Sequence, residues 1–164
     1  MKITVLNTGG TFNKRYNPIL GQLEVPKDNM ALDKIIKSCF NIEFDIRNIV
    51  SKDSLDFTQE DRETILENII NSGNDKIIII HGTDTVDLTS KFIEDKIEGK
   101  KIVFTGAMVP MSIDEVEATM NFSQAIGFLN APIENGIYLS MHGVVVEHSK
   151  LVKDRSVGQF LVKN

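Results

Sequence analysis

The chain has 164 residues, of which 41% are hydrophobic and 25% are charged, and its formal net charge at pH 7 is −5. This length fits one domain with a sizeable core, and the composition is ordinary for a soluble globular protein. A net negative charge provides no basic face for a polyanion, which argues against nucleic acid as a partner.

The cysteine and histidine residues indicate the cellular compartment and whether a disulfide or a metal site is expected. Cys39 is the only cysteine, so an internal disulfide is excluded and a reducing cytoplasm is expected. No signal-peptide h-region and no apolar run of membrane length is evident, so we expect no membrane partner. His81, His142 and His148 are scattered, without the spacing of metal ligands. These features predict a compact, cytoplasmic protein with no metal site.

The first element is an apolar, β-branched run at residues 2–6, which predicts a buried strand. Gly9 and Gly10 follow it and allow the backbone to turn with positive φ. Thr11 then stands at the carboxyl end of the strand, where open α/β sheets place their ligand crevices. Its hydroxyl is either a nucleophile or a polar group that satisfies the local backbone, and the turn alone leaves both roles open.

The next segment predicts a loop and then a helix. Residues 14–22 carry Pro and Gly without periodicity, so we expect a loop able to close over a neighbouring site. Tyr16 is the one aromatic side chain of this loop, and its alternative role is a partly buried anchor. Asp28 or Asn29 can cap a helix whose apolar positions continue to Cys39.

Two helix signals flank a buried strand in the middle of the chain. Thr58 and Asp61 are spaced as a capping-box variant, although Asp is a poorer partner at this position than Glu or Gln. Residues 76–80 include four consecutive isoleucines, which is typical of a central strand covered on both faces. Thr85 is expected to cap the helix that follows this strand.

The remaining elements continue the alternation of strands and helices. A short strand is expected at residues 101–104, a helix over 114–129, and a strand or strand pair over 137–146. The tail from residue 147 is polar and is expected to be irregular until residues 157–162.

Strands that alternate with helices over residues 1–164 predict a single α/β domain. The expected architecture is a doubly wound, mostly parallel sheet with helices on both faces, of the Rossmann-like or flavodoxin-like kind. The carboxyl ends of parallel strands share one edge of the sheet, so residues far apart in sequence can meet there. The polar or glycine residues at the predicted strand ends are Thr11, Ser54 with Asp56, Thr83 with Asp84, and Gly106.

The polar residues at these ends differ in how well a structural role explains them. Asp56 is well explained as a turn residue that binds its own backbone. Thr83 and Asp84 lack an obvious structural role if Thr85 caps the next helix. A phosphate-binding loop is disfavoured, because neither G-x-G-x-x-G nor a P-loop with its lysine is present.

A threonine nucleophile needs a base or a proton relay, because its hydroxyl is otherwise a poor nucleophile. His81 is the only histidine near a candidate threonine, two residues before Thr83. A lysine serves as the base where burial and its neighbours lower its pKa. The tail offers Lys150 and Lys153, and their spacing does not decide between them.

These motifs resemble the signatures of the bacterial-type L-asparaginases. Residues 8–11 (T-G-G-T) and 81–85 (H-G-T-D-T) are similar to the two threonine signatures, in this order and each after a strand. Residues 53–58 are similar to the substrate loop between them, and residues 106–108 and 153–160 are similar to later landmarks. The resemblance covers essentially the whole chain.

The resemblance implies a role for each matching residue. Thr11 would be the nucleophile that attacks the side-chain amide carbon of the substrate. Thr83 and Lys153, with Asp84 nearby, would form the second hydroxyl–lysine relay of the family. Tyr16 would be the tyrosine of the mobile lid loop.

The resemblance also implies a substrate pocket that needs no cofactor. Ser54 would bind the α-carboxylate of the substrate, and Asp84 its α-ammonium. A small amide would be hydrolysed through an acyl-enzyme, with release of ammonia. The implied substrate-binding residues are Gly10, Ser54, Leu55, Thr83, Asp84 and Ala107.

Two departures from the family bear on substrate and assembly. Leu55 stands where the family usually has a polar side chain, and an apolar residue cannot orient an ammonium. The family also has a C-terminal domain, and residues 1–164 are expected to correspond only to its N-terminal α/β domain. In the family that domain, from a neighbouring subunit, completes the site. We therefore expect a homo-oligomer, with Val109 and Met111 as an exposed apolar patch.

Two functions of different class are compatible with these residues. The first is an asparaginase-like amidohydrolase, with hydrolysis of L-asparagine to L-aspartate and ammonia as the expected reaction. The second is a non-catalytic, stand-alone domain that binds an amino acid or a protein partner, which the missing domain and Leu55 favour.

Overall fold

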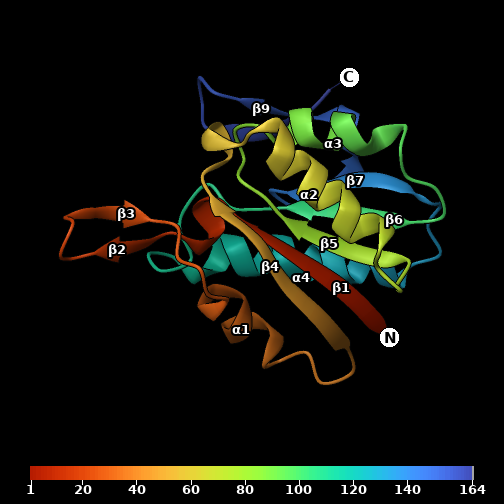
Figure 1. Ribbon diagram of the computed structural model, residues 1–164, viewed down its shortest axis with the longest axis horizontal. Coiled ribbons are helices and arrows are strands. Elements are labelled where there is room, and N and C mark those ends of the chain that lie inside the picture. Colours follow the sequence, from red (N-terminus) through yellow and green to blue (C-terminus); the bar gives the residue numbers. More distant parts are fainter. Residues whose placement is uncertain (164) are drawn as a thin grey trace.

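A computed structural model describes residues 1–163 of the chain. A six-stranded sheet lies at its centre, in the order β4-β1-β5-β6-β7-β8 (Figure 1). Its strands are β1 (Lys2–Gly9), β4 (Glu43–Lys52), β5 (Lys76–Ile80), β6 (Lys101–Thr105), β7 (Gly136–Met141) and β8 (Val144–Glu147). The pairs β4–β1, β1–β5, β5–β6 and β6–β7 are parallel, and β7–β8 is antiparallel. The predicted mostly parallel sheet is confirmed.

The central strands are apolar because both faces of the sheet are covered. Ile77, Ile78, Ile79 and Ile80 of β5 are each 0% exposed. Their side chains alternate between two apolar clusters, one on each face of the sheet. The four-isoleucine run therefore forms the middle of the core, as its sequence predicts.

Four helices cover the two faces. They are α1 (Met30–Ile36), α2 (Gln59–Ile70), α3 (Val86–Glu94) and α4 (Glu115–Asn130). α1 and α4 pack on one face, and α2 and α3 on the other (Figure 1). The doubly wound arrangement is confirmed. Among residues 1–163, no helix has both the length and the apolar character needed to cross a membrane.

The helix termini follow the sequence signals in part. The predicted capping box of α2 is present, with the Thr58 Oγ1 accepting from the Asp61 amide and the Asp61 carboxylate accepting from the Thr58 amide. Asp114 caps α4 through the Val116 amide. α1 ends at Ile36, one turn before the predicted last apolar position at Cys39.

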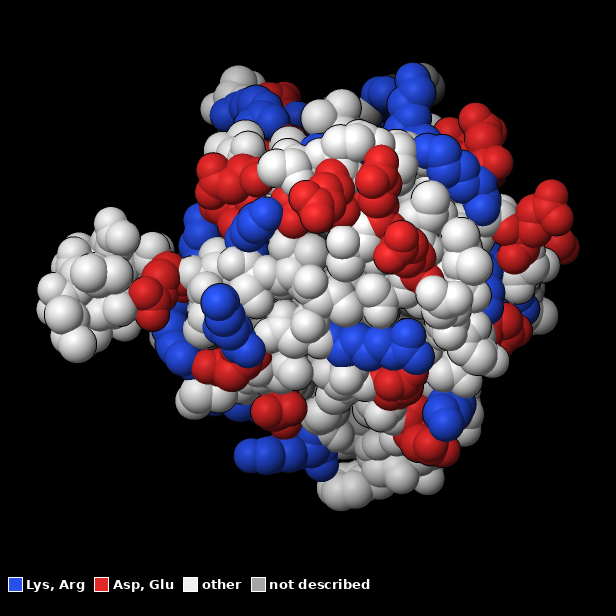
Figure 2. Space-filling view, viewed as in Figure 1, with Lys and Arg blue, Asp and Glu red and all other residues white. Residues whose placement is uncertain are grey.

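The predicted loop at residues 14–22 is wrong in part, because two short strands pair there. β2 (Arg15–Asn17) and β3 (Gln22–Glu24) form an antiparallel hairpin that projects from the body of the protein (Figure 1). Gly21 has a φ of +67°, and the Asn17 side chain accepts from the Ile19 amide in the connecting turn. The tip of this arm carries no charge, whereas charges of both signs cover the visible face of the body (Figure 2).

The tail is also more regular than its sequence predicts. β9 (Leu151–Asp154) and β10 (Gln159–Val162) pair as an antiparallel hairpin. Leu151 and Phe160 bury their side chains in the apolar cluster that also contains residues of α2 and α3. This burial seats the hairpin on the sheet and fixes which of its residues face the strand ends.

Candidate active site

The two threonine motifs meet at the point where the strand order of the sheet reverses. β1 has β4 on one side and β5 on the other, so the chain crosses in opposite directions around it. Ligands of open α/β sheets bind at such a switch point, outside the carboxyl ends of the strands. Thr11 follows β1 and Thr83 follows β5, so the fold brings both loops to this place.

Glycines allow the loops after β1, β4 and β5 to pack backbone to backbone. Gly10 has a φ of +73°, and a Cβ built on it would lie 2.5 Å from the Gly82 Cα. A Cβ on Gly82 would lie 2.5 Å from the Ser54 Oγ. The Gly10 amide also donates to the Lys52 carbonyl at 3.0 Å. No side chain larger than hydrogen fits at either glycine, which explains the residue type.

A cluster of polar side chains joins the loop after β5 to β9. The Lys153 Nζ donates to the Thr83 Oγ1 and to the Asp84 Oδ1, each at 2.9 Å. Thr83 is 6% exposed, and the side chains of Lys153 and Asp84 are 14% and 24% exposed. Lys153 is about 70 positions away from Thr83 and Asp84 in the sequence. In the fold its largely buried ammonium contacts both the Thr83 hydroxyl and the Asp84 carboxylate.

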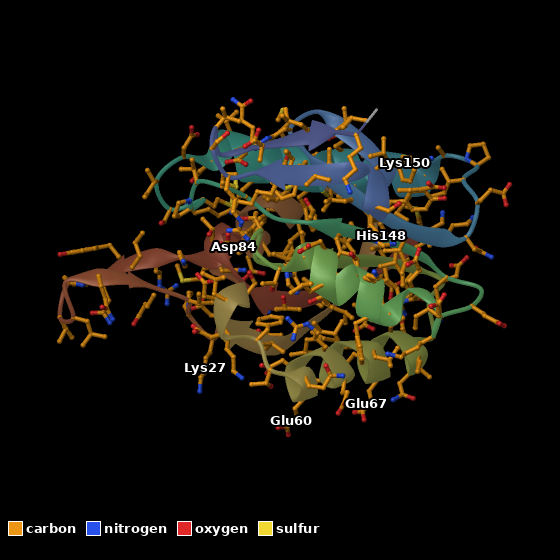
Figure 3. The ribbon with its side chains drawn as sticks, turned by 90° about the horizontal axis from the view of Figure 1, so that it is seen from above. Lys27, Glu60, Glu67, Asp84, His148 and Lys150 are labelled. Atoms are coloured by element: carbon orange, nitrogen blue, oxygen red, sulfur yellow. The ribbon has the colours of Figure 1, made fainter. Side chains whose placement is uncertain are left out.

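The structure separates the two lysines that sequence spacing leaves equivalent. Lys150 pairs with Glu147 at 2.7 Å in an exposed 3₁₀ turn, His148–Lys150. Lys153 lies on β9 and reaches the threonine loop. Figure 3 shows Asp84 toward the side from which the β2–β3 hairpin projects and Lys150 toward the opposite side.

Arg155 is a member of this cluster that sequence reasoning missed. Its Nη1 donates to the Asp84 Oδ1 and its Nη2 to the Asp84 carbonyl oxygen, the latter at 2.9 Å. Burial raises the pKa of the Asp84 carboxyl, but the hydrogen bonds from Lys153 and Arg155 outweigh it and hold that pKa below its ordinary value. No pattern marks Arg155 in the sequence, because the turn between β9 and β10 alone sets its position.

Ser54 lies in a 3₁₀ turn, Ser54–Asp56, next to the same cluster. Its carbonyl accepts a 2.8 Å hydrogen bond from the Thr85 Oγ1. Thr85 thus occupies the expected N-cap position of α3, but its hydroxyl binds the neighbouring loop instead of the helix amides. The Ser54 Oγ is buried and has no hydrogen-bond partner in residues 1–163, so it is free to bind a ligand.

His81 is not placed to act as the base. Its Nδ1 is 2.8 Å from the Gly82 carbonyl, to which it donates, and its Nε2 is 2.9 Å from the Thr89 Oγ1. Complete burial lowers the pKa of His81 from 6.5 to about 4, so the ring is neutral at pH 7. The ring fixes the Gly82 backbone and packs edge-on against Phe57 and Phe104.

Thr11 and Tyr16 are held less tightly than the Thr83 cluster. Thr11 is partly buried at the start of a 3₁₀ turn, Thr11–Asn13, and its hydroxyl makes no hydrogen bond within residues 1–163. Tyr16 lies on the projecting hairpin and is 62% exposed. The structure therefore does not bring Tyr16 into contact with the cluster.

The remaining predicted site residues differ in exposure. Leu55 follows Ser54 and is 66% exposed, whereas Ala107 is fully buried beyond the end of β6. The predicted apolar patch is wrong for Met111, which is 3% exposed and packs in the core with α4. Val109 is 37% exposed. Two apolar side chains close to Val109 in the sequence have larger exposed fractions, namely Ile113 at 67% and Val116 at 71%.

The hydrogen-bonded cluster borders a groove of about 510 Å³ between α3 and the β9–β10 hairpin, lined in part by Thr83, Asp84, Lys153 and Arg155. In residues 1–163, no three His, Cys, Asp or Glu side chains are grouped so that they could hold a metal ion. The groups present are hydroxyls, a carboxylate and cations. Such a set can bind a small zwitterion and transfer protons.

Residues 2–159 match a family model described as "Asparaginase, N-terminal". The L-asparaginase of Thermococcus kodakarensis is 28% identical over 162 residues, which cover 96% of this chain and 49% of that protein. One subunit of the glutamyl-tRNA(Gln) amidotransferase of Methanococcus maripaludis is 29% identical over 151 residues, which cover 86% of this chain and 35% of that protein.

Solved structures show the same likeness. The thermostable L-asparaginase from T. kodakarensis superposes with a TM-score of 0.87 at 27% identity, over 100% of this chain and 52% of that one. A probable cytoplasmic L-asparaginase from Campylobacter jejuni has a TM-score of 0.75 at 23% identity, over 97% of this chain and 50% of that one, and supports the fold alone. The chain spans about half the length of these L-asparaginases.

Proposed function

The chain belongs to the asparaginase family and corresponds to its N-terminal domain, and from this premise we propose that it hydrolyses the side-chain amide of a small amino acid. L-Asparagine is the proposed substrate, with L-aspartate and ammonia as products. The observation that carries this proposal is the Lys153 Nζ at 2.9 Å from both Thr83 Oγ1 and Asp84 Oδ1. It is the proton-transfer pair that a hydroxyl-based mechanism requires.

In the proposed reaction Thr11 is the nucleophile. Its Oγ1 adds to the amide carbon, its proton passes to the amide nitrogen, and ammonia leaves with formation of a Thr11 ester. Water then adds to the ester, one proton of the water passes through the Thr83 hydroxyl to the Thr11 oxygen as that oxygen leaves, and the Lys153 ammonium, which donates to Thr83, stabilises the charge that develops there. The sum is one amide and one water converted to one acid and one ammonia. The free hydroxyl of Thr11 and its place beside β5 support this assignment.

The proposed substrate contacts use the polar groups at the same edge. The unpartnered, buried Ser54 Oγ is suited to a carboxylate, and the Asp84 carboxylate to an ammonium. Gly10 and Ala107 would form walls of the pocket, and Leu55 an apolar one. Tyr16 would reach the site only if the β2–β3 hairpin moves, because it is 62% exposed on that arm.

Ammonia release from asparagine, glutamine and related small amides tests this proposal. The purified protein is expected to release ammonia from at least one of them, and Thr11→Ala to reduce this release to background. Thr11→Ser is the matched control, because it keeps a hydroxyl. No ammonia above the Thr11→Ala level from any amide would overturn the proposal.

A second candidate function is an amino-acid- or partner-binding domain without turnover. Arg155 favours the partner-binding form of this function, because the Asp84 carboxylate already binds two cations and the ammonium of an amino-acid ligand would have to compete with Arg155. One of the related proteins is, by its name, a subunit of an amidotransferase, which fits a domain that works beside a partner. Calorimetry that detects aspartate binding in a protein without ammonia release would support this function over hydrolysis.

Self-association is a further part of the proposal. The exposed side chains of Val116 and Met120 are spaced i and i+4 in the first turns of α4, so they form one apolar stripe, and exposed Ile113 lies just before the N-cap of this helix. A second copy of the chain would cover this stripe. Light scattering is expected to report a dimer or larger species that dissociates in Val116→Lys, and a monomer in the unaltered protein would refute it.

A further inference from the structure

His142 occupies a strained position at the carboxyl end of β7. It is the one non-glycine residue of residues 1–163 with a positive φ, at +51°. β7 pairs with β6, so His142 lies at the same edge of the sheet as the threonine loops. Strained backbone of this kind persists where the surroundings hold it, and it clusters at functional sites. The contacts of His142 show what holds it.

On one side His142 binds α4. Its backbone amide donates to the Asn121 Oδ1 at 3.0 Å, and its Nε2 lies 2.9 Å from the Glu117 Oε1. Both partners lie one helical turn apart on the same face of the helix. The Glu117 and His142 side chains are only 16% and 23% exposed, so this pair is largely shielded from water.

The same two helix residues hold the loop after β6. The Glu117 carboxylate accepts from the Met108 amide at 2.9 Å and from the Val109 amide at 3.0 Å. The Asn121 Nδ2 donates to the Gly106 carbonyl at 3.0 Å. The segment 106–109, which contains Ala107, is therefore fixed by side chains that also bind His142.

On its other side His142 binds the hairpin that carries the lysine. Its Nδ1 accepts from the Phe160 amide at 3.2 Å, and the two rings pack edge-on at 6.0 Å. Phe160 pairs directly with Lys153 in the β9–β10 register. An Nδ1 that accepts leaves the proton on Nε2, which donates to Glu117. The ring is therefore neutral and bridges α4 and β10 through its two nitrogens.

We propose that His142 is a positioning residue that couples the Ala107 loop to the Lys153 strand, and that this coupling requires Nδ1 as a hydrogen-bond acceptor. The inference rests on the proposed amide hydrolysis for its kinetic consequences, but not for its structural ones. A second proton would occupy Nδ1 and remove the acceptor of the Phe160 amide. Glu117 is the charged group of residues 1–163 in contact with the ring, since β10 contributes only a backbone amide and an aromatic ring.

The kinetic test compares His142→Leu and His142→Asn with a matched pair elsewhere. His142→Leu loses both ring bonds, and its kcat for ammonia release at pH 7.5 is expected to fall at least tenfold. His142→Asn keeps an acceptor for the Phe160 amide and tolerates a positive φ, so it recovers at least threefold of this loss. Glu94→Gln, which alters the other histidine–glutamate pair at 3.2 Å, is expected to leave kcat unchanged.

The difference between the two variants separates positioning from a general loss of structure. Both replace the imidazole ring, but only His142→Asn keeps an acceptor for the Phe160 amide. An equal loss of kcat in His142→Leu and His142→Asn would overturn the proposal.

Amide hydrogen exchange tests the coupling without activity. His142→Leu is expected to speed exchange about tenfold or more in both segments 106–109 and 159–162, and Glu94→Gln in neither. Faster exchange in only one segment would show that His142 does not couple them and would refute the proposal. A wild-type protein that releases no ammonia would refute the proposed function alone, and the exchange result would still decide on His142.

Discussion

The loops after β1 and β5 lie side by side, but different interactions hold them. Thr83 and Asp84 are bound by the side chains of Lys153 and Arg155, in a cluster of charge-assisted hydrogen bonds. Thr11 has a free hydroxyl, and its loop is held by the close backbone contact of Gly10 with Gly82. The relay is thus preorganised by side chains, and the nucleophile by the backbone. This difference means that side-chain truncation disrupts the first, and an added Cβ disrupts the second.

Truncation of Lys153 is expected to have the largest effect. Lys153→Met keeps the length and the apolar stem but removes the ammonium, so ammonia release is expected to fall about 1,000-fold, within the range for loss of a proton-transfer group. Lys150→Met is the control, because Lys150 pairs only with Glu147 on the surface. An equal loss in both variants would show that the Thr83–Lys153 contact has no special role.

An added methyl group at Gly10 tests the backbone-held loop. In Gly10→Ala the new Cβ clashes with the Gly82 Cα, and the alanine must also keep a positive φ. The free energy of unfolding is therefore expected to fall by about 3–4 kcal/mol. Gly21→Ala shares the positive φ but has no atom within 4 Å, and should lose only about 1–2 kcal/mol. Denaturant unfolding measures both variants. Equal losses would show that the contact with Gly82 is unimportant.

His81 fixes the Gly82 backbone in the loop after β5, and its burial predicts a pH dependence of stability. Its pKa is about 4 in the folded protein and near 6.5 when exposed, so the unfolded state binds the extra proton between these values. The stability that comes from a neutral His81 is present above pH 6.5 and is lost as the pH falls toward 4, by about 3 kcal/mol. In denaturant unfolding, the free energy of unfolding of His81→Gln should not show this decrease between pH 6.5 and pH 4. The same slope in both proteins would contradict the assignment.

Asp84 is expected to have the smallest effect on stability. Its pKa is lowered from 3.8 in the folded state, so its contribution is present above pH 3.8 and is lost as the pH falls through the lower folded value. At pH 7 the free energy of unfolding of Asp84→Asn is expected to be about 1–2 kcal/mol lower than that of the wild type. This difference should shrink well below pH 3.8. Asp95→Asn, which alters an exposed carboxylate, should show no difference at either pH.

Much of the fold follows from local patterns in the sequence. The four isoleucines of β5, the Thr58 capping box and the alternation of strands and helices are all confirmed, because each depends on neighbours within a few residues. The β2 and β3 strands were missed, since three-residue strands carry too few positions for a periodicity. The predicted exposure of Met111 is wrong, because packing against α4 and not the local sequence decides its burial.

The candidate site divides in the same way. Residue type and order along the chain were enough to select Thr11, Ser54, Thr83 and Asp84, because the carboxyl ends of parallel strands must share an edge. Residue spacing leaves Lys150 and Lys153 equivalent and only the resemblance favours Lys153, whereas the contact of Lys153 with Thr83, the hydrogen bonds of Arg155 to Asp84 and the contacts of His142 emerge only in three dimensions. Each depends on how the β9–β10 hairpin is seated on the sheet. The burial of Leu151 and Phe160 decides that seating, and the spacing of charged residues in the sequence does not encode it.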